Sequence, residues 1–137
     1  MKNQLITILS SFFCYLILTN SIQAQESIFD KLNAIATVDE KVMMPMRDGV
    51  RLASDIYRPK EAGKYPIIFS RTPYNFNSWG DGEQRTRTAK SAYEYVKKGY
   101  AYVVQNERGR FYSEGEWDIL GVPLTDGYDA FEWMKNQ

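Results

Sequence analysis

Apolar residues recur at every second position over residues 42–46, and a second alternation runs through Val50, Leu52, Ser54 and Ile56. A period of two is typical of strands that bury one face. Asp48-Gly49 separates the two stretches, and glycine tolerates the positive φ of a tight primed turn. The pattern predicts an antiparallel hairpin. Because Pro45 has no N–H to donate to a neighbouring strand, the first strand is predicted to lie at a sheet edge.

The rest of the chain predicts strands that alternate with helices. Residues 66–69 and 100–104 are short apolar runs, and the first of these suits a strand buried on both faces, as in parallel sheets. Between them, Ala89, Ala92, Tyr93 and Val96 follow helical spacing, and Gly99 provides a left-handed stop. A last helix is expected over the apolar residues 130–134, capped by Thr125 or Asp126. This order of elements indicates an α/β open sheet with flanking helices.

Residues 1–24 differ in composition from the rest of the chain. Lys2 precedes an uncharged, mostly apolar stretch over residues 5–18, and Ala24 offers a small residue at a cleavage point. This is the layout of a secretory signal peptide. The stretch is too short for the roughly 30 Å hydrocarbon core of a membrane. We therefore expect export to the periplasm or the extracellular space, with no stable membrane anchor after cleavage.

Composition narrows the classes of function. The 137 residues are 44% hydrophobic, as expected of one globular domain, and 17 basic residues balance 17 acidic ones. Like charges do not gather in runs, so nucleic acid is not expected as a partner. The single cysteine, Cys14, lies within the expected signal peptide. The chain contains no histidine, so these residues alone cannot build a histidine-dependent active site.

Motifs for metals and cofactors were not found. Without histidine or a mature cysteine only carboxylates remain, and Glu114, Glu116 and Asp118 lack the spacing of a calcium loop, so we interpret them as solvated loop charges. The glycines around Asp81 do not form a dinucleotide or phosphate-binding fingerprint. No metal and no cofactor is therefore expected.

A serine nucleophile is also not found in this chain. The strained elbow of serine hydrolases usually reads Gly-x-Ser-x-Gly, and that motif is absent. Ser113 precedes Glu114-Gly115, but Phe111 occupies the place of the first glycine. We interpret Ser113 as a loop residue.

Several segments of the chain, in order, resemble one known family. They are Met46 to Pro59 (MRDGVRLASDIYRP), Ser70 to Tyr74 (SRTPY), Gly99 to Tyr102 (GYAY), Glu107 to Arg110 (ERGR) and Ser113 to Gly115 (SEG). Together they resemble the N-terminal part of the X-Pro dipeptidyl-peptidase family, which includes cocaine-esterase-like enzymes and α-amino-acid ester hydrolases. The resemblance implies an α/β-hydrolase domain with a Ser-Asp-His triad, followed by a jelly-roll domain.

The resemblance also suggests a division of the chain. We expect a signal peptide at 1–24, a lead-in segment at 25–40 and the N-terminal portion of the α/β-hydrolase domain at 41–137. In the family's order of elements, residue 137 falls before the strand that ends in the nucleophile elbow. The expected fold is therefore an incomplete α/β-hydrolase fold, truncated before that elbow.

One position matched by the resemblance carries chemistry. In this family the loop after the third strand supplies a tyrosine whose hydroxyl helps to bind the oxyanion, and the SRTPY segment places Tyr74 there. General α/β hydrolases also draw one oxyanion donor from this loop, and a phenol can donate at neutral pH. The alternative is a loop tyrosine that only covers the end of the sheet.

Other loop residues have two interpretations each. Arg108, Gly109 and Arg110 follow the fourth predicted strand, at the sheet end where ligands bind in open α/β sheets. They form either an active-site rim or ion pairs with acidic neighbours. Phe76, Trp79 and Trp117 line an acyl pocket in one interpretation and pack against the domain in the other.

The predicted function is that of an N-terminal fragment of an exported serine hydrolase that cleaves ester or amide bonds and is inactive alone. A small-molecule ester, amide or peptide is the expected substrate of the full-length protein. The alternative is a free-standing secreted binding module. The family's sheet order disfavours that alternative, because residues 67–69 would then present an unpaired apolar edge.

Overall fold

The computed structural model describes residues 26–76, 82–119 and 124–137. The expected signal peptide and the loop residue Trp79 lie outside these ranges. Within them, no helix is long and apolar enough to cross a membrane.

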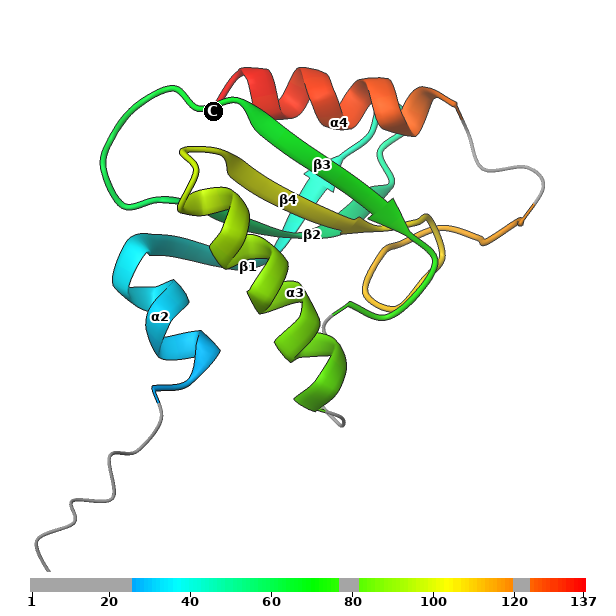
Figure 1. The fold of residues 1–137 in the computed structure, drawn as a ribbon. Helices are drawn as coiled ribbons and strands as arrows, with labels where there is room; N and C mark the ends of the chain where they lie inside the picture. Colours follow the sequence, from blue (N-terminus) through cyan, green and yellow to red (C-terminus); the bar gives the residue numbers. More distant parts are fainter. Residues whose placement is uncertain (1–25, 77–81, 120–123) are drawn as a thin grey trace, which may run out of the picture.

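A four-stranded mixed sheet forms the centre of the molecule (Figure 1). Its spatial order is β1 (Ala36–Pro45), β2 (Arg51–Pro59), β4 (Ala101–Asn106) and β3 (Ile67–Thr72). β2 pairs antiparallel with both β1 and β4, whereas β3 and β4 are parallel. Parallel strands need a crossover connection, and helix α3 (Gly82–Val96) lies between β3 and β4 in the chain. The predicted α/β arrangement, an antiparallel hairpin leading into a parallel unit, is confirmed.

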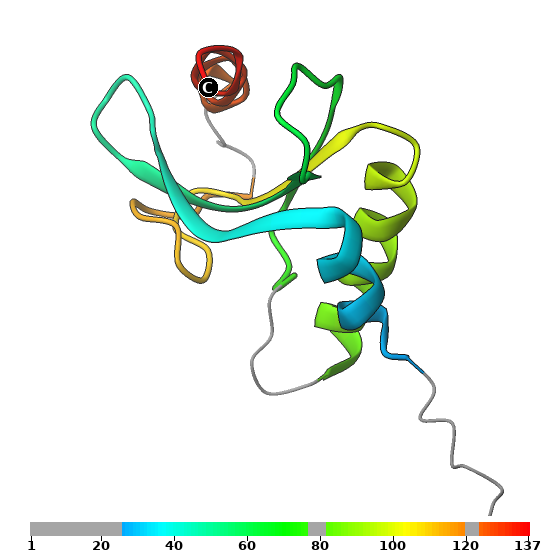
Figure 2. The ribbon, with the colours of Figure 1, turned by 90° about the vertical axis from the view of Figure 1, so that its left-hand side faces the viewer.

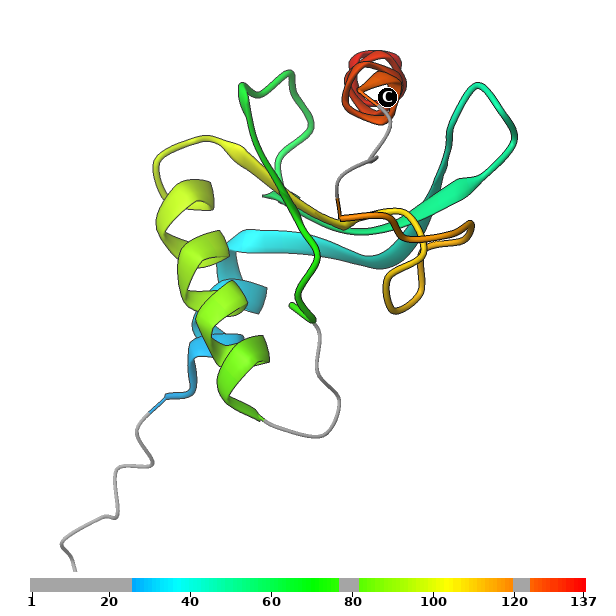
Figure 3. The ribbon, with the colours of Figure 1, turned by 90° about the vertical axis from the view of Figure 1, so that its right-hand side faces the viewer.

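Helices cover both faces of the sheet (Figures 2 and 3). Helix α2 (Ile28–Ile35) and α3 pack on one face, where Ala92 is fully buried. Helix α4 (Thr125–Lys135) lies on the other, over a second cluster in which Met44 and Ala130 are fully buried. The sheet is therefore the middle of three layers, with a separate apolar cluster on each side.

Helix α3 follows the predicted helical spacing. Ala89, Ala92 and Val96 are buried, and Gly99 adopts φ +83° after the last turn, where its N–H donates to the Val96 carbonyl at 2.9 Å. Helical spacing and the glycine stop are therefore both confirmed. The helix begins at Gly82, well before the first buried alanine.

The hairpin is confirmed, but its turn differs from the prediction. The Met46 N–H donates to the Val50 carbonyl at 2.8 Å, and the Gly49 N–H donates to the Met46 carbonyl at 2.9 Å. Among the three loop residues only Gly49 has a positive φ, +85°. A two-residue primed turn of type I′ needs positive φ at both central residues, so this is a three-residue loop that ends in a left-handed glycine.

β1 starts at Ala36, before the residues 42–46 from which the strand was predicted. A bulge interrupts the alternation of apolar residues within this strand. Between Asp39 and Val42 the register shifts, and Lys41 adopts φ +56°. Ala36 lies in the cluster under α2 and α3, whereas Met44 lies in the cluster under α4. The bulge thus moves the even-numbered residues from one face to the other. The segment 25–40, expected as a lead-in, contains α2 and the first half of this strand.

Both outer strands have a free edge among the described residues. β1 pairs only with β2, as Pro45 predicted, and β3 pairs only with β4. Every residue of β3 is partly exposed, so the expectation of a strand buried on both faces is wrong. The reason is that its second edge is uncovered in the described part of the chain.

A buried carboxylate supports the bulge of β1. Asp55 of β2 is 1% exposed, and its Oδ1 accepts the Lys41 N–H at 2.8 Å. The Tyr57 hydroxyl donates to its Oδ2 at 3.4 Å. Burial raises the pKa of Asp55 to about 6. The charged form is thus disfavoured in the folded protein.

This burial predicts a pH-dependent effect of Asp55→Asn. Because the folded pKa lies above the unfolded value, the contribution of Asp55 is most favourable below pH 4 and is lost as the pH rises through about 6. Asparagine keeps the acceptor for Lys41 without the buried charge. We expect the variant to exceed the parent chain in free energy of unfolding at pH 7.5 by up to about 3 kcal/mol, and the difference to shrink toward pH 4. Urea unfolding at both pH values checks this, and a pH-independent difference would contradict it.

Candidate functional site

The carboxyl ends of β3 and β4 meet at one edge of the sheet, because the two strands are parallel. Thr72, the last residue of β3, pairs with Asn106, the last residue of β4. The loops that follow, residues 73–76 and 107–119, therefore leave the sheet side by side. In open α/β sheets this is the edge at which ligands bind. We call these two loops and the ends of the two strands the carboxyl edge.

Tyr74 lies on the first loop of the carboxyl edge and is 75% exposed. Its N–H donates to the Thr72 hydroxyl at 3.1 Å, and its carbonyl accepts from the Asn106 amide at 3.0 Å. The preceding carbonyl, of Pro73, accepts from Arg110 Nε at 3.0 Å. The backbone that carries the phenol is thus held by these hydrogen bonds, while the residue itself remains largely exposed. Its role in binding an oxyanion stays a prediction.

Ser113 connects the second loop to the sheet. It is 8% exposed, and its hydroxyl accepts the Ala53 N–H and donates to the Asn106 carbonyl, both at 2.9 Å. Both hydrogen bonds are to backbone groups, so the side chain ties the loop to β2 and β4. The position fits the interpretation of Ser113 as a loop residue.

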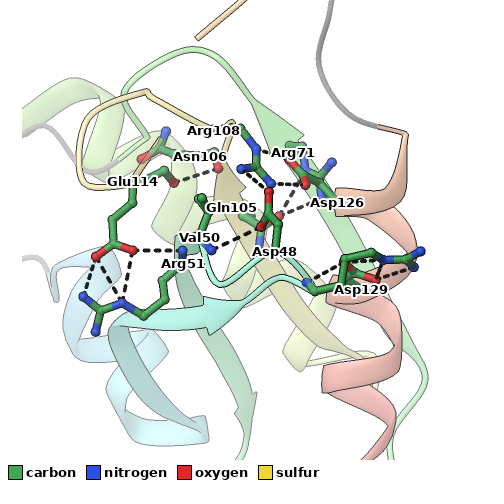
Figure 4. Close-up of polar contacts among 12 residues, drawn as sticks. Asp48, Val50, Arg51, Arg71, Gln105, Asn106, Arg108, Glu114, Asp126 and Asp129 are labelled. Atoms are coloured by element: carbon green, nitrogen blue, oxygen red, sulfur yellow. Dashed lines mark hydrogen bonds and ion pairs between the residues drawn. The ribbon is translucent and has the colours of Figure 1, made fainter. Parts of the chain in front are cut away.

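Arg108 forms the buried ion pair of the site (Figure 4). Its Nε and Nη2 donate to the two oxygens of Asp126 at 3.1 and 2.7 Å, and its Nη1 donates to Asp48 at 2.8 Å. These hydrogen bonds raise the pKa of Arg108 and lower that of Asp48. Asp126 is 1% exposed. Of the two interpretations of Arg108, the structure shows the ion pair.

The ion pair between Arg108 and Asp126 also bears on the start of α4, where the predicted cap is wrong. Thr125 and Asp126 both lie in the first turn of α4 and not at its cap, which is Leu124 without a side-chain hydrogen bond. Its carboxylate binds the guanidinium of Arg108. A neighbouring contact, between Arg47 and Asp129 at 2.6 Å, adds a second tie between the hairpin loop and α4.

The second loop packs tightly on itself. Gly109 has φ +68°, and a Cβ there would lie 2.3 Å from the backbone nitrogen of Trp117. The guanidinium of Arg110 lies 4.6 Å from the centre of the Trp117 ring, and the Trp117 indole donates to Glu107 at 3.1 Å. Glycine is therefore required at 109, because any side chain would meet backbone.

Two of the three aromatic residues of the suggested acyl pocket, Phe76 and Trp117, lie in the described part of the chain, and both pack against other residues of the domain. Phe76 is 7% exposed and belongs to the cluster under α2 and α3, and its carbonyl accepts the hydroxyl of Thr88 at 3.0 Å. Trp117 packs on Arg110. Trp79 lies outside the described ranges. For the two that are described, packing against the domain is the observed arrangement.

A polar network at the end of β4 was missed by sequence reasoning. Arg71 Nε and Nη2 donate to the Gln105 side-chain oxygen at 3.0 and 2.9 Å, and the Gln105 amide donates to the Ser54 hydroxyl at 3.0 Å. Burial lowers the pKa of Arg71. Gln105 and Asn106 are both almost fully buried. Two amides directly after the apolar run of β4 were the available signal.

The acidic residues of the second loop do not gather around a cation. Glu114 accepts from both the backbone and the side chain of Arg51, and Arg51 holds the pKa of this carboxyl below its ordinary value. Within the described ranges, acidic and cysteine side chains form no cluster able to hold a metal ion.

Comparison with known proteins identifies the family. The model of X-Pro dipeptidyl-peptidase (S15 family) matches residues 48–137. Cocaine esterase from Rhodococcus sp. (strain MB1 Bresler) is 41% identical over 102 residues, which cover 74% of this chain and 17% of the esterase. The matched residues therefore span about a sixth of the length of this relative.

Solved structures agree with the sequence comparison. An α-amino acid ester hydrolase, 28% identical, superposes with a TM-score of 0.59 over 87% of this chain and 22% of its own. A CocE/NonD family hydrolase from Staphylococcus aureus, 22% identical, shows the same fold with a TM-score of 0.63 over 74% of this chain and 21% of its own. The fold is thus a partial α/β-hydrolase fold, and the chain belongs to the X-Pro dipeptidyl-peptidase family.

Proposed function

We propose that this chain is the N-terminal portion of an exported serine hydrolase that cleaves ester or amide bonds of acyl or aminoacyl substrates. The observation that carries the proposal is the placement of Tyr74 at the carboxyl edge, on a loop fixed by Asn106 and Arg110. The family supports hydrolysis, and the relatives include an ester hydrolase and an aminopeptidase. The substrate class is therefore a small ester, amide or peptide.

The contribution of this portion to the reaction is electrostatic. When a nucleophile attacks a carbonyl, the oxygen gains negative charge, and a donor placed in advance stabilises it more than it stabilises the substrate. The exposed phenol of Tyr74 is such a donor. The nucleophile and its base must come from the rest of the protein, since this chain has no histidine and no serine elbow. We expect residues 25–137 alone to be inactive.

Export stays part of the proposal and rests on residues 1–24. Their basic start, apolar stretch and small residue before position 25 fit a signal peptide. The activity should then appear in the periplasm or the medium, with a mature N-terminus near residue 25.

A paired assay tests the function. The full-length gene product and the isolated chain are each given a 4-nitrophenyl ester and a dipeptidyl 4-nitroanilide, and each is treated with a fluorophosphonate that labels activated serines. We expect the full-length protein to release nitrophenol or nitroaniline and to be labelled, and the chain to do neither. A full-length protein that is neither labelled nor active on either substrate contradicts the proposal and favours a binding module.

A further inference from the structure

Two consecutive carbonyls of the Tyr74 loop are held by side chains from one other segment. The Asn106 amide donates to the Tyr74 carbonyl, and Arg110 Nε donates to the Pro73 carbonyl, each at 3.0 Å. Both donors follow or end β4, whereas their acceptors follow β3. The two side chains thus form a clamp across the carboxyl edge.

The donors of this clamp are themselves fixed. Asn106 is 1% exposed, and its carbonyl accepts the hydroxyl of Ser113, which in turn accepts the Ala53 N–H of β2. Arg110 lies over the ring of Trp117 at 4.6 Å. The clamp is therefore braced by the sheet on one side and by the packed second loop on the other.

Such a clamp affects the reaction rate only if the rate depends on the position of the Tyr74 hydroxyl. The phenol hydroxyl lies at the far end of the side chain, so a small rotation of the backbone at residues 73–74 displaces it by more than the rotation moves the backbone itself. An oxyanion donor must lie about 2.7–3.1 Å from the developing charge. A misplacement of about 1 Å costs up to about 100-fold in rate.

We propose that Asn106 and Arg110 are positioning residues, which act through the Pro73 and Tyr74 carbonyls to aim the Tyr74 hydroxyl at the oxyanion. The inference rests on the proposed function, because it needs Tyr74 to be the donor. The ion pair of Arg108, two residues away, serves the packing of α4. Within the ERGR segment, Arg108 thus holds α4, whereas Arg110 holds the Tyr74 loop.

The test is a double-mutant cycle in the full-length protein. Asn106→Leu and Arg110→Met each remove one donor and keep most of the side-chain volume, whereas Arg110→Lys retains an N–H. We expect each donor-removing variant to lower kcat by about 10-fold, with KM changed less than about twofold, and Arg110→Lys to recover most of the loss. In a Tyr74→Phe background the same variants should lower kcat by less than about twofold.

The outcomes separate the inference from the function on which it rests. An unchanged kcat in Tyr74→Phe overturns the oxyanion role and the clamp with it. If Tyr74→Phe lowers kcat but Arg110→Met costs the same factor in both backgrounds, the clamp is overturned and the oxyanion role stands. Arg58→Met, an exposed arginine paired with Asp39 of β1, is the control and should leave kcat unchanged. If Asn106→Leu does not fold, the Arg110 variants decide alone.

Discussion

Replacement of Tyr74 by phenylalanine in the full-length protein is expected to lower kcat by about 10²–10³-fold. The substitution removes one hydroxyl from a side chain that is 75% exposed, so packing and stability should hardly change. A lost oxyanion donor costs about 2.7–4 kcal/mol of transition-state stabilisation. Steady-state kinetics on an ester substrate measure the effect, and KM should move much less than kcat, because the hydrogen bond strengthens as charge develops.

A second tyrosine supplies the matched control. Tyr128 on α4 is also largely exposed, at 62%, and its ring lies beside the guanidinium of Arg47. Tyr128→Phe should leave kcat within about twofold of the parent. Equal losses in the two variants would mean that the effect of Tyr74→Phe is not specific to the carboxyl edge.

Replacement of Arg108 by methionine is expected to cost about 3–5 kcal/mol of the free energy of unfolding. The variant leaves the carboxylate of Asp126, 1% exposed, buried without its cation, and an uncompensated buried charge is among the most destabilising changes. It also releases Asp48 of the hairpin loop. Urea unfolding of this chain, followed by circular dichroism, measures the loss.

Two further variants test whether that loss of stability comes from the unpaired buried charge. Arg51→Met removes an exposed pair, with side chains 56% and 40% exposed, and should cost less than about 1 kcal/mol. Arg108→Met combined with Asp126→Leu removes both buried charges and should recover most of the stability. If the double variant is as unstable as the single one, the loss comes from packing and not from the unpaired carboxylate.

The local patterns of the chain were sufficient for most of the architecture. The alternation on either side of Asp48-Gly49, the helical spacing up to Val96 and the apolar runs predicted the hairpin, α3, β3 and β4. The hairpin and α3 could be predicted because each buries one face or one stripe against a neighbour, so burial repeats with the period of the backbone. β3 and β4 were predicted from their apolar runs instead. The edge position of β1 followed from one missing N–H, at Pro45.

Two of the predictions failed because a residue's partner is distant in the chain. The first strand was predicted only from residue 42 onward, because the bulge at Lys41 reverses the buried face. The Lys41 N–H in this bulge donates to the carboxylate of Asp55. Asp126 was expected as a candidate helix cap, but its carboxylate binds Arg108. In each case the observed contact joins residues that are 14 or more positions apart, and a local pattern carries no information on such a contact.

The candidate site divides in the same way. The sequence by itself determined that Tyr74 follows β3, that the ERGR segment follows β4, and that no histidine is available within these residues. Only the tertiary structure decided that Arg108 packs α4 while Arg110 and Asn106 hold the Tyr74 loop. The parallel pairing of β3 and β4 brings two loops that lie about 30 residues apart in the chain to the same edge of the sheet. Local periodicity carries no information on such a pairing.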